Sequence, residues 1–399
     1  MPTYTIVQAP SHLGLRAPGV ERLPEALLAA GLAERLGARP GPRLAAPPFD
    51  PEVDPATGLL NPHGLRDHVV ALADALGAAV DSETVPIVLG GDCTILLGIT
   101  LALRRRARHG LLFLDGHADF YPPEAEPTGE AASMELGLVT GRGPELLTDL
   151  EGRRPLVRDE DTVVFGFRDA EHAAAEGSRP LAPTIRSMDL PTLRRRGVEP
   201  ALGDALAHLL RPGGPQGFWV HLDVDVLDEA VMPAVDYRLP DGLTWDELAT
   251  VLQAAVATGH VAGLDIAIFN PTLDRDGRIA RALVDTLGRR AHLGRREAQQ
   301  GAEHSRRPGR RRGRRGGPEG GPDGHVGQAA LHRHGLAPWP RPRPGRWRPA
   351  GGGAEPGAAL VVGVVDDQQD LDLAPGQGAQ GGVGALGGEP AGAAARAPA

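Results

Sequence analysis

The sequence of 399 residues contains no lysine, a single cysteine and few aromatic residues, which make up 4% of the chain. A single cysteine, Cys93, excludes an intramolecular disulfide framework and is typical of a reducing compartment. No apolar run approaches the roughly 18 residues of a membrane-spanning helix. Residues 1–20 lack the basic start and apolar stretch of a signal peptide. We therefore expect a cytoplasmic protein that has no membrane partner.

The net charge of −9 is distributed unevenly along the chain. Residues 1–290 contain 27 Arg and 41 acidic residues, whereas residues 291–399 contain 15 Arg and 10 acidic residues. An acidic excess over most of the chain argues against nucleic acid as a partner. Residues 291–399 also contain 25 Gly and 12 Pro, a proportion that is typical of low-complexity segments.

Three interpretations of residues 291–399 remain open. They are a solvated disordered extension, the frameshift product of an out-of-frame read of GC-rich DNA, or an Arg-Gly-rich arm that binds RNA. The use of Arg for all 42 basic residues is consistent with a GC-rich coding sequence. We therefore assign the function to one domain, residues 1–290, and none of it to residues 291–399.

Within residues 1–290, short β-branched or apolar runs alternate with segments of helical apolar spacing. The expected strands are 4–8, 85–89, 111–114, 162–167, 218–224 and 261–268, and a seventh is possible at 184–188. The expected helices are 65–80, 95–108, 201–210, 244–257 and 278–289. Thr244 with Glu247 has the spacing of a capping box. This alternation predicts an α/β fold of three layers, α-β-α, around a mostly parallel sheet.

Polar residues gather where these expected strands end. The motifs are Gly90-Gly91-Asp92-Cys93, Asp115-Gly116-His117-Ala118-Asp119 and Asp223-Val224-Asp225. In an open parallel sheet the carboxyl ends of the strands meet at one edge, where the functional site forms. Because side chains alternate along an extended backbone, the three polar residues of the second motif are expected on one face. The two aspartates of the third motif are expected together for the same reason.

Four carboxylates that converge without a cation between them would repel one another and raise one another's pKa values. Bound divalent cations would remove that repulsion. Hard oxygen ligands with one imidazole suit Mn²⁺, while Zn²⁺, Fe²⁺ or Ni²⁺ remain possible. Four carboxylates and one imidazole exceed what one small ion needs, so we expect two ions. Each motif alone is also compatible with a polar strand end or turn.

These motifs resemble those of the ureohydrolase family, which includes arginase, agmatinase and formiminoglutamase. The family's signatures Gly-Gly-Asp-His, Asp-x-His-x-Asp and Asp-x-Asp-Val correspond to residues 90–93, 115–119 and 223–226. The resemblance covers about residues 4–290 and implies an arginase-like metallohydrolase domain with two Mn²⁺ ions. It also implies hydrolysis of a non-peptide C–N bond in a small amidine or guanidino compound, and a homotrimer or homohexamer.

The resemblance, carried over position by position, also implies a set of metal ligands. They are Cys93, Asp115, His117, Asp119, Asp223 and Asp225. Asp115 and Asp223 would bridge the two ions. Cys93 and Asp119 would complete one site, and the remaining two ligands the other. Two cations lower the pKa of a shared water and generate hydroxide near neutral pH, and Asp119 would pass its proton to the leaving nitrogen.

Three departures from the family's pattern leave the substrate open. Cys93 stands where the family has a metal-binding His, and a thiolate favours Zn²⁺ or Fe²⁺ unless it stays a neutral buried thiol. Ile268 stands where arginases place a Glu for the guanidinium, so arginine or agmatine bound in the usual manner is not expected. The family's proton-shuttling His aligns with Ala132, for which Glu130 or Ser133 are candidate substitutes.

Substrate-binding residues are expected at the mouth of the site. Asp236 and Arg238 would suit a zwitterionic or anionic substrate, unless they form only a surface ion pair. Glu171 lies where the family often contacts the substrate's α-amino group. His221, which precedes Asp223 by two residues, either supports a metal ligand or is structural. The alternative to an enzyme is a catalytically inactive arginase-like protein that binds a ligand or forms oligomers.

Overall fold

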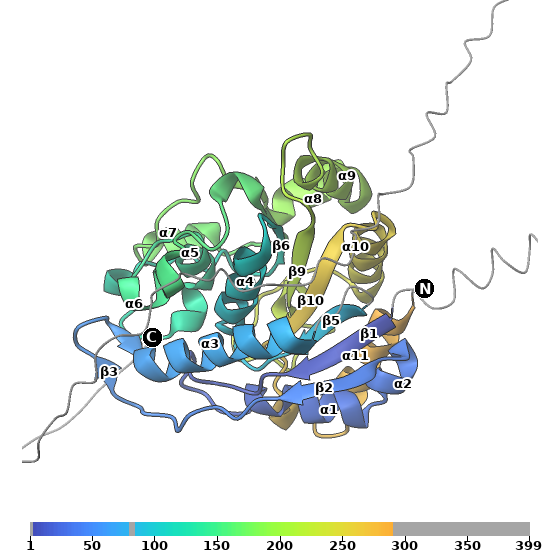
Figure 1. Ribbon diagram of the computed structural model, residues 1–399. Coiled ribbons are helices and arrows are strands. Elements are labelled where there is room, and N and C mark those ends of the chain that lie inside the picture. The colour runs from blue at the N-terminus through green and yellow to red at the C-terminus, as the bar shows by residue number, and fades with distance from the viewer. Residues whose placement is uncertain (1–2, 80–83, 290–399) are drawn as a thin grey trace, which may run out of the picture. The chain divides into compact units, whose positions relative to one another are not determined.

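The structure, a computed structural model, describes residues 3–79 and 84–289 (Figure 1). The interpretations of residues 291–399 lie outside these described residues. The main sheet contains β1 (Thr3–Gln8), β2 (Arg39–Arg43), β5 (Thr84–Leu89), β6 (Gly110–Leu114), β7 (Thr162–Phe165), β8 (Arg186–Met188), β9 (Phe218–Asp223) and β10 (Val261–Ala267). A separate antiparallel pair is formed by β3 (Val53–Asp54) and β4 (Leu59–Leu60).

The six expected strands and the possible seventh are present, within a few residues of their expected bounds. The short pair β3 and β4 was not expected, and in the main sheet the unexpected strand is β2, whose sequence Arg-Pro-Gly-Pro-Arg has the composition of a turn. It pairs with β1 at the edge of the sheet, where a proline does not interrupt a ladder on both sides.

Helices cover both faces of the sheet (Figure 1). One face packs against α1 (Leu23–Ala29), α2 (Leu32–Leu36), α8 (Leu190–Arg196), α9 (Val198–Leu209), α10 (Trp245–Ala257) and α11 (Arg278–Gly288). The other face packs against α3 (Pro62–Ala79), α4 (Ile95–Arg106), α5 (Glu135–Val139) and α6 (Glu145–Thr148). Successive side chains of β6 point to opposite faces of the sheet, so Leu112 packs in the core on one face and Phe113 in the core on the other. The expected three-layer α/β architecture is therefore confirmed.

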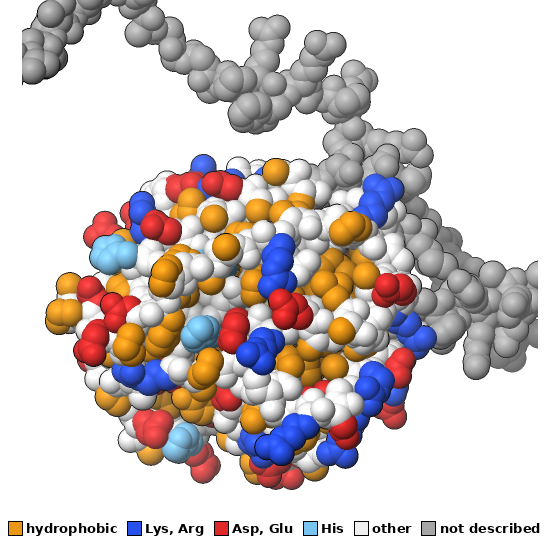
Figure 2. Space-filling view, turned by 90° about the horizontal axis from the view of Figure 1, so that it is seen from below, with side chains coloured by type: hydrophobic (Ala, Val, Ile, Leu, Met, Phe, Trp, Pro, Cys, Tyr) orange, Lys and Arg blue, Asp and Glu red, His pale blue; other side chains and the backbone are white. Residues whose placement is uncertain are grey.

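The capping box predicted for α10 is present. The backbone N–H of Glu247 donates to Thr244 Oγ1 at 3.2 Å, and the backbone N–H of Thr244 donates to Glu247 Oε2 at 2.9 Å. None of the helices within the described ranges has both the length and the hydropathy needed to cross a lipid bilayer. On the face shown in Figure 2, acidic and Arg side chains are interspersed rather than gathered into a patch of one sign.

The strand order positions the site. The order is β2-β1-β5-β10-β9-β6-β7-β8, and all neighbouring strands are parallel. The last two strands of the described residues, β9 and β10, therefore insert between β5 and β6 and bring four carboxyl ends together. The register places His221 of β9 between Asp265 of β10 and Phe113 of β6. This edge of the sheet is where a site is expected in such a fold.

Candidate metal centre

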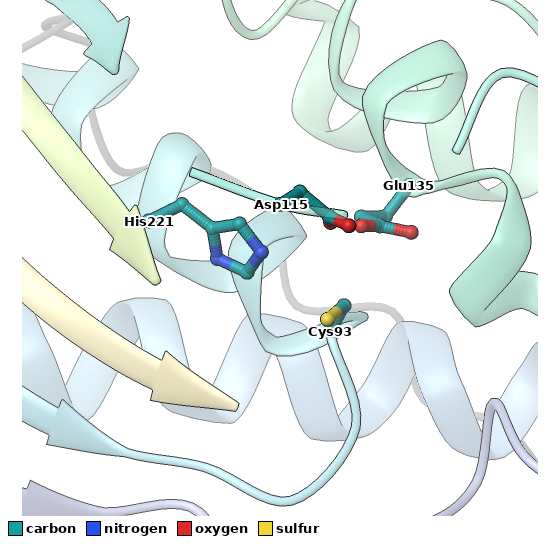
Figure 3. Close-up of side chains that lie close together, drawn as sticks. All are labelled: Cys93, Asp115, Glu135 and His221. Carbon is teal, nitrogen blue, oxygen red and sulfur yellow. The ribbon is translucent and has the colours of Figure 1, made fainter. Parts of the chain in front are cut away.

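Two groups of metal-ligating side chains converge at the carboxyl ends of the four central strands. The ligand atoms of the first, which we name the inner group, lie within 4.8 Å of one another and belong to Cys93, Asp115, Glu135 and His221 (Figure 3). Those of the second, the outer group, meet the same criterion and belong to Asp115, His117 and Asp225. Asp115 is a member of both groups, so the two form one continuous cluster.

The loop after β5 positions Cys93. At Gly91 an added Cβ would lie 1.8 Å from the carbonyl oxygen of Ser11, so the close approach of the two loops requires glycine. The backbone N–H of Asp92 donates to that same carbonyl at 2.9 Å, and the Asp92 carboxylate accepts the backbone N–H of Thr94 at 2.9 Å. Asp92 therefore fixes the loop, and Cys93 directs its side chain into the cluster.

Turns beyond the strands, and not strand alternation, bring the predicted aspartates together. After Asp223 the chain enters a 3₁₀ turn, Val224–Val226, in which the backbone N–H of Asp225 donates to Asp223 Oδ1 at 2.8 Å. The strand β6 ends at Leu114, so the second motif lies in a loop. We expected the second and third motifs to converge, and they do. The prediction that an extended backbone brings their side chains together is wrong for both motifs, because one lies in a loop and the other continues into a 3₁₀ turn.

The buried carboxyl groups of Asp119 and Asp223 belong to neither group but lie close enough to the carboxylates of the cluster to interact with their charges. Burial, followed by the charges of neighbouring carboxylates, raises the pKa of Asp115, Asp119, Asp223 and Glu135 well above the usual values. Arg168 lies close by, but its guanidinium donates to backbone carbonyl groups of the segment after β9. The charge of the cluster is therefore largely uncompensated by the side chains around it.

His117 and Asp225 form an ion pair within the outer group, with His117 Nδ1 2.9 Å from Asp225 Oδ2. Burial alone would lower the pKa of His117, but the charge and hydrogen bond of Asp225 outweigh it and raise that pKa. Burial would likewise raise the pKa of Asp225, but His117 lowers it. A metal ion binds only the neutral imidazole, so binding here would displace the proton that His117 shares with Asp225.

Several polar atoms of the inner group lack a hydrogen-bond partner among the described residues. They are Asp115 Oδ2, both carboxylate oxygens of Glu135, and His221 Nε2. An unsatisfied buried polar atom costs roughly 1–3 kcal/mol. All of these atoms are metal-ligating types that face one another, so a bound cation would supply the partner that each of them lacks. The residues present thus fit a metal centre.

Sequence reasoning missed Glu135 and left the role of His221 open. Glu135 opens the short helix α5 in an otherwise apolar stretch, residues 134–139, and its side chain is fully buried. A lone acidic residue within such a stretch is the signal that could have identified it, because buried carboxylates are rare unless something pairs with them.

Glu130, a predicted catalytic residue, is buried and engaged on both oxygens. It accepts the backbone N–H of Arg16 at 2.6 Å and the phenolic O–H of Tyr237 at 2.6 Å. Burial and the charge of Glu130 raise the pKa of Tyr237 above its usual value. Glu130 belongs to neither the inner nor the outer group, and its catalytic role stays a prediction.

The predicted substrate-binding residues line the surface rather than the cluster. Asp236 is half-buried and accepts a hydrogen bond from Asn270 Nδ2 at 3.0 Å. Burial raises the pKa of Asp236, although this hydrogen bond opposes the shift. Arg238 and Glu171 are exposed. Their contacts with a substrate stay predictions.

Two non-glycine residues near the strand ends adopt left-handed backbone conformations, Asp119 with φ 43° and Ile268 with φ 70°. This conformation is unusual for a β-branched residue and costs about 1–3 kcal/mol. The backbone N–H of Ile268 donates to the carbonyl of Gly91 at 2.8 Å, which holds the turn after β10 against the loop of Cys93. Strain of this kind concentrates at functional sites.

The chain is similar to known arginases in sequence. Residues 3–292 match the model of the arginase family. An arginase of Staphylococcus aureus (strain MRSA252) is 27% identical over 293 residues, 71% of this chain and 95% of that protein. An arginase of Agrobacterium fabrum is 29% identical, over 71% of this chain and 89% of that protein.

Solved structures share the fold. The arginase of Bacillus caldovelox has a TM-score of 0.65 at 24% identity and covers 73% of this chain and 98% of its own. A hypothetical agmatinase of Burkholderia thailandensis has a TM-score of 0.53 at 16% identity and covers 75% and 87%. Because the family model spans more than half of the sequence, the chain belongs to the arginase family.

Proposed function

We propose that this chain is a binuclear metal-dependent hydrolase that cleaves a non-peptide C–N bond in a small amidine or guanidino compound. The observation that carries the proposal is the membership of Asp115 in two adjacent groups of buried metal-ligating atoms. One ligand common to two sites is what a pair of bridged cations requires. The arginases and agmatinases among the similar proteins support the hydrolase class.

The ligand set predicted from the sequence would supply both sites. Asp115 and Asp223 would bridge, with Cys93 and Asp119 on one side and the His117–Asp225 pair on the other. Mn²⁺ suits the oxygen-rich side, and Cys93 leaves Zn²⁺, Fe²⁺ or Ni²⁺ possible. Two bound cations would activate a water molecule and stabilise the charge that develops on the substrate.

Asp119 would carry the proton. Its carboxyl group is buried and lies close to that of Glu135, and both effects raise its pKa. Asp119 would accept the proton of the attacking water and donate it to the leaving nitrogen. Glu130, hydrogen-bonded to the half-exposed Tyr237, would relay protons between this region and solvent.

The residues around the centre favour a substrate other than arginine bound in the usual manner. The buried Ile268 cannot pair with a guanidinium at the position where a carboxylate would be needed. Asp236, Arg238 and Glu171 would instead select a small molecule that carries a zwitterionic or anionic group.

The test is release of urea or ammonia from a panel of guanidino, ureido and formimino compounds, with Mn²⁺, Zn²⁺, Ni²⁺ or Fe²⁺ added. We expect turnover of at least one compound, lost in Asp225→Asn and kept in Asp285→Asn, which alters an exposed ion pair. Metal binding without turnover of any compound would favour the alternative, a catalytically inactive arginase-like protein that binds a ligand or forms oligomers.

A further inference from the structure

We infer that the inner group is a four-ligand site for Zn²⁺, in which Glu135 and His221 are ligands in place of Asp119 and Asp223. The outer group would then hold a different, harder cation of the Mn²⁺ type. The inference rests on the proposed function, in which the cluster binds two cations, and it assigns unlike ions and further ligands to that cluster.

The inner group has the number, kind and spacing of ligands that zinc prefers. Four elements each contribute one atom: the loops after β5 and β6, the start of α5, and β9. The atoms lie within 4.8 Å of one another. In a tetrahedral zinc site with bonds of about 2.0–2.3 Å, the ligand atoms lie roughly 3.5 Å apart. The four side chains therefore need to move only slightly to bind one ion.

His221 is held in the tautomer and orientation of a metal ligand. Its Nδ1 lies 2.7 Å from Asp265 Oδ2, and a carboxylate accepts a hydrogen bond, so Nδ1 carries the proton. Nε2 therefore keeps a lone pair that points into the inner group and can bind a metal ion. The imidazole stacks on Phe113 with ring centroids 4.8 Å apart. Trp219 Nε1 donates to the other oxygen of Asp265 at 2.6 Å. The Trp219 ring fits because Gly263 has no Cβ, which would lie 2.1 Å from it.

Glu135 has no other evident use for its charge. Its side chain is fully buried, and neither carboxylate oxygen accepts a hydrogen bond within the described part of the chain. Burial and the charge of Asp115 raise the pKa of Glu135, and the interactions with the carboxyl of Asp119 and with its own backbone oppose this rise only in part. An unpaired buried carboxylate costs several kcal/mol, and coordination of a cation offsets that cost.

Cys93 makes the inner group softer than the outer group. Its thiol donates to Asp223 Oδ2 at 3.0 Å, and metal binding would release that proton and leave a thiolate. Sulfur, nitrogen and two oxygens suit zinc, whereas the two carboxylates and one imidazole of the outer group suit Mn²⁺. The two groups therefore differ in the ion they select.

The test uses the full chain, stripped with a chelator and reloaded with Zn²⁺, Mn²⁺ or Co²⁺ alone. Metal per chain is measured by mass spectrometry after dialysis, and Co²⁺ reports geometry by absorption. We expect tight retention of one Zn²⁺ per chain. Co²⁺ should give a thiolate-to-cobalt charge-transfer band and the strong visible absorption of a tetrahedral site.

Variants separate ligands from bystanders. Glu135→Gln keeps the shape of the side chain and should lower Zn²⁺ affinity at least about 10-fold and weaken the tetrahedral Co²⁺ spectrum, with Mn²⁺ retention unchanged. Cys93→Ser should remove the charge-transfer band. Glu199→Gln, an exposed residue of α9, is the matched control and should match the parent chain in both readouts.

Unchanged Zn²⁺ affinity and Co²⁺ spectrum in Glu135→Gln would overturn the inference, as would a Co²⁺ spectrum without the thiolate band. Failure of the proposed function is distinguishable. One tightly held Zn²⁺ that depends on Glu135, together with no turnover of any substrate class, would defeat the proposed function alone. Two equivalent Mn²⁺ ions with turnover would defeat the inference alone.

Discussion

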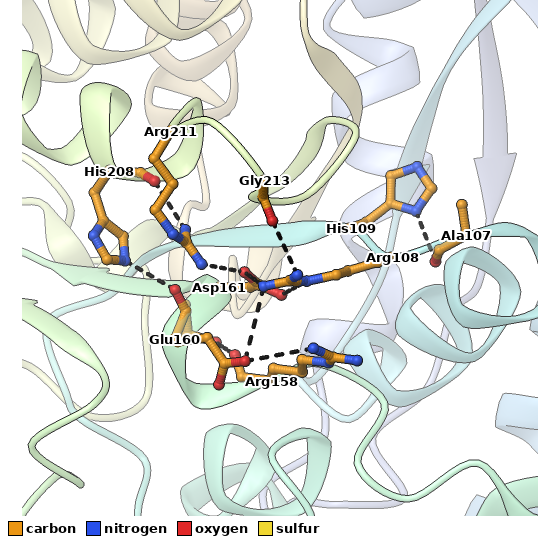
Figure 4. A network of polar contacts seen from close by, with 10 residues as sticks. Ala107, Arg108, His109, Arg158, Glu160, Asp161, His208, Arg211 and Gly213 are labelled. Atoms are coloured by element: carbon orange, nitrogen blue, oxygen red, sulfur yellow. Dashed lines mark hydrogen bonds and ion pairs between the residues drawn. The ribbon is translucent and has the colours of Figure 1, made fainter.

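Asp161 and Asp115 are both fully buried carboxylates, but the chain surrounds them differently. Two arginines bind Asp161 (Figure 4). Arg108 places Nε 2.6 Å from Oδ2 and Nη2 2.8 Å from Oδ1, and Arg211 places Nη2 2.6 Å from Oδ1. Among the described residues, no arginine forms a hydrogen bond with the carboxylate of Asp115, and its Oδ2 has no partner.

The difference appears in the pKa values. Burial alone would raise the pKa of Asp161, but the hydrogen bonds and charges of Arg108 and Arg211 outweigh it and lower that pKa. At Asp115 burial and the nearby carboxylates act in the same direction and raise the pKa. The two carboxyl groups are both inaccessible to solvent, but their pKa values shift in opposite directions. The chain pairs a structural carboxylate with its own cations and leaves the cluster at the strand ends to be neutralised by bound ones.

Removal of Asp161 should change the stability of the protein more than any other substitution considered below. Asp161→Ala removes the acid that Arg108 and Arg211 share, and because both arginines are partly exposed it should lower the free energy of unfolding by about 3 kcal/mol. Urea denaturation measures it. Asp285→Ala, in an exposed ion pair with Arg35, is the control and should cost at most about 1 kcal/mol. Equal losses in the two variants would remove the distinction.

A smaller effect is expected where a carboxylate supports the cluster without joining it. Asp265 accepts hydrogen bonds from both His221 and Trp219. Asp265→Asn should weaken the hold on the His221 tautomer and lower metal affinity about 10–100-fold, with the fold intact. Titration with a competing chelator measures the affinity, and circular dichroism checks the fold. Unaltered affinity would mean that Asp265 serves packing only.

The opposite pKa shifts at Asp115 and Asp161 make opposite contributions to the pH dependence of stability. Between the usual carboxyl range and the raised pKa values of the cluster, the native state binds more protons than the unfolded state. The metal-free protein should therefore lose stability as pH rises from about 5 to about 8, by about 1.4 kcal/mol per pH unit for each extra proton. Stability from Asp161 is present above the usual carboxyl pKa and is lost as pH falls below it.

Thermal denaturation with chelator across this pH range measures the dependence. Readdition of Zn²⁺ and Mn²⁺ should abolish the loss at alkaline pH, because the ions replace the bound protons. Greater stability of the metal-free chain at about pH 8 than at about pH 5 would contradict the account.

The smallest effect has the opposite sign to that at Asp161. Asp115→Asn removes one member of the repelling cluster and should raise the stability of the metal-free protein at alkaline pH by about 1 kcal/mol. The same change should abolish metal retention. Chemical denaturation in the presence of a chelator tests the first point, and destabilisation there would show that repulsion at Asp115 is unimportant.

Much of the fold could be predicted because the apolar periodicity of strands and helices is local, and β2 could not because its prolines suit a turn equally well. The motifs at Cys93, Asp115 and Asp225 could be predicted because strand ends in a parallel sheet coincide. Glu135 comes from a helix whose place beside the sheet is a tertiary property. Local spacing likewise does not reveal which carboxylates, such as Asp161, find distant arginines.

Binding of cations at the strand ends is best measured as the metal content of the full chain at neutral pH, after incubation with Mn²⁺ and Zn²⁺ and removal of free ions. We expect about two divalent ions per chain, and about one in Asp225→Asn. A chain that retains no metal under these conditions would contradict this expectation, because the buried carboxylates would then persist without the cations that we hold responsible for them.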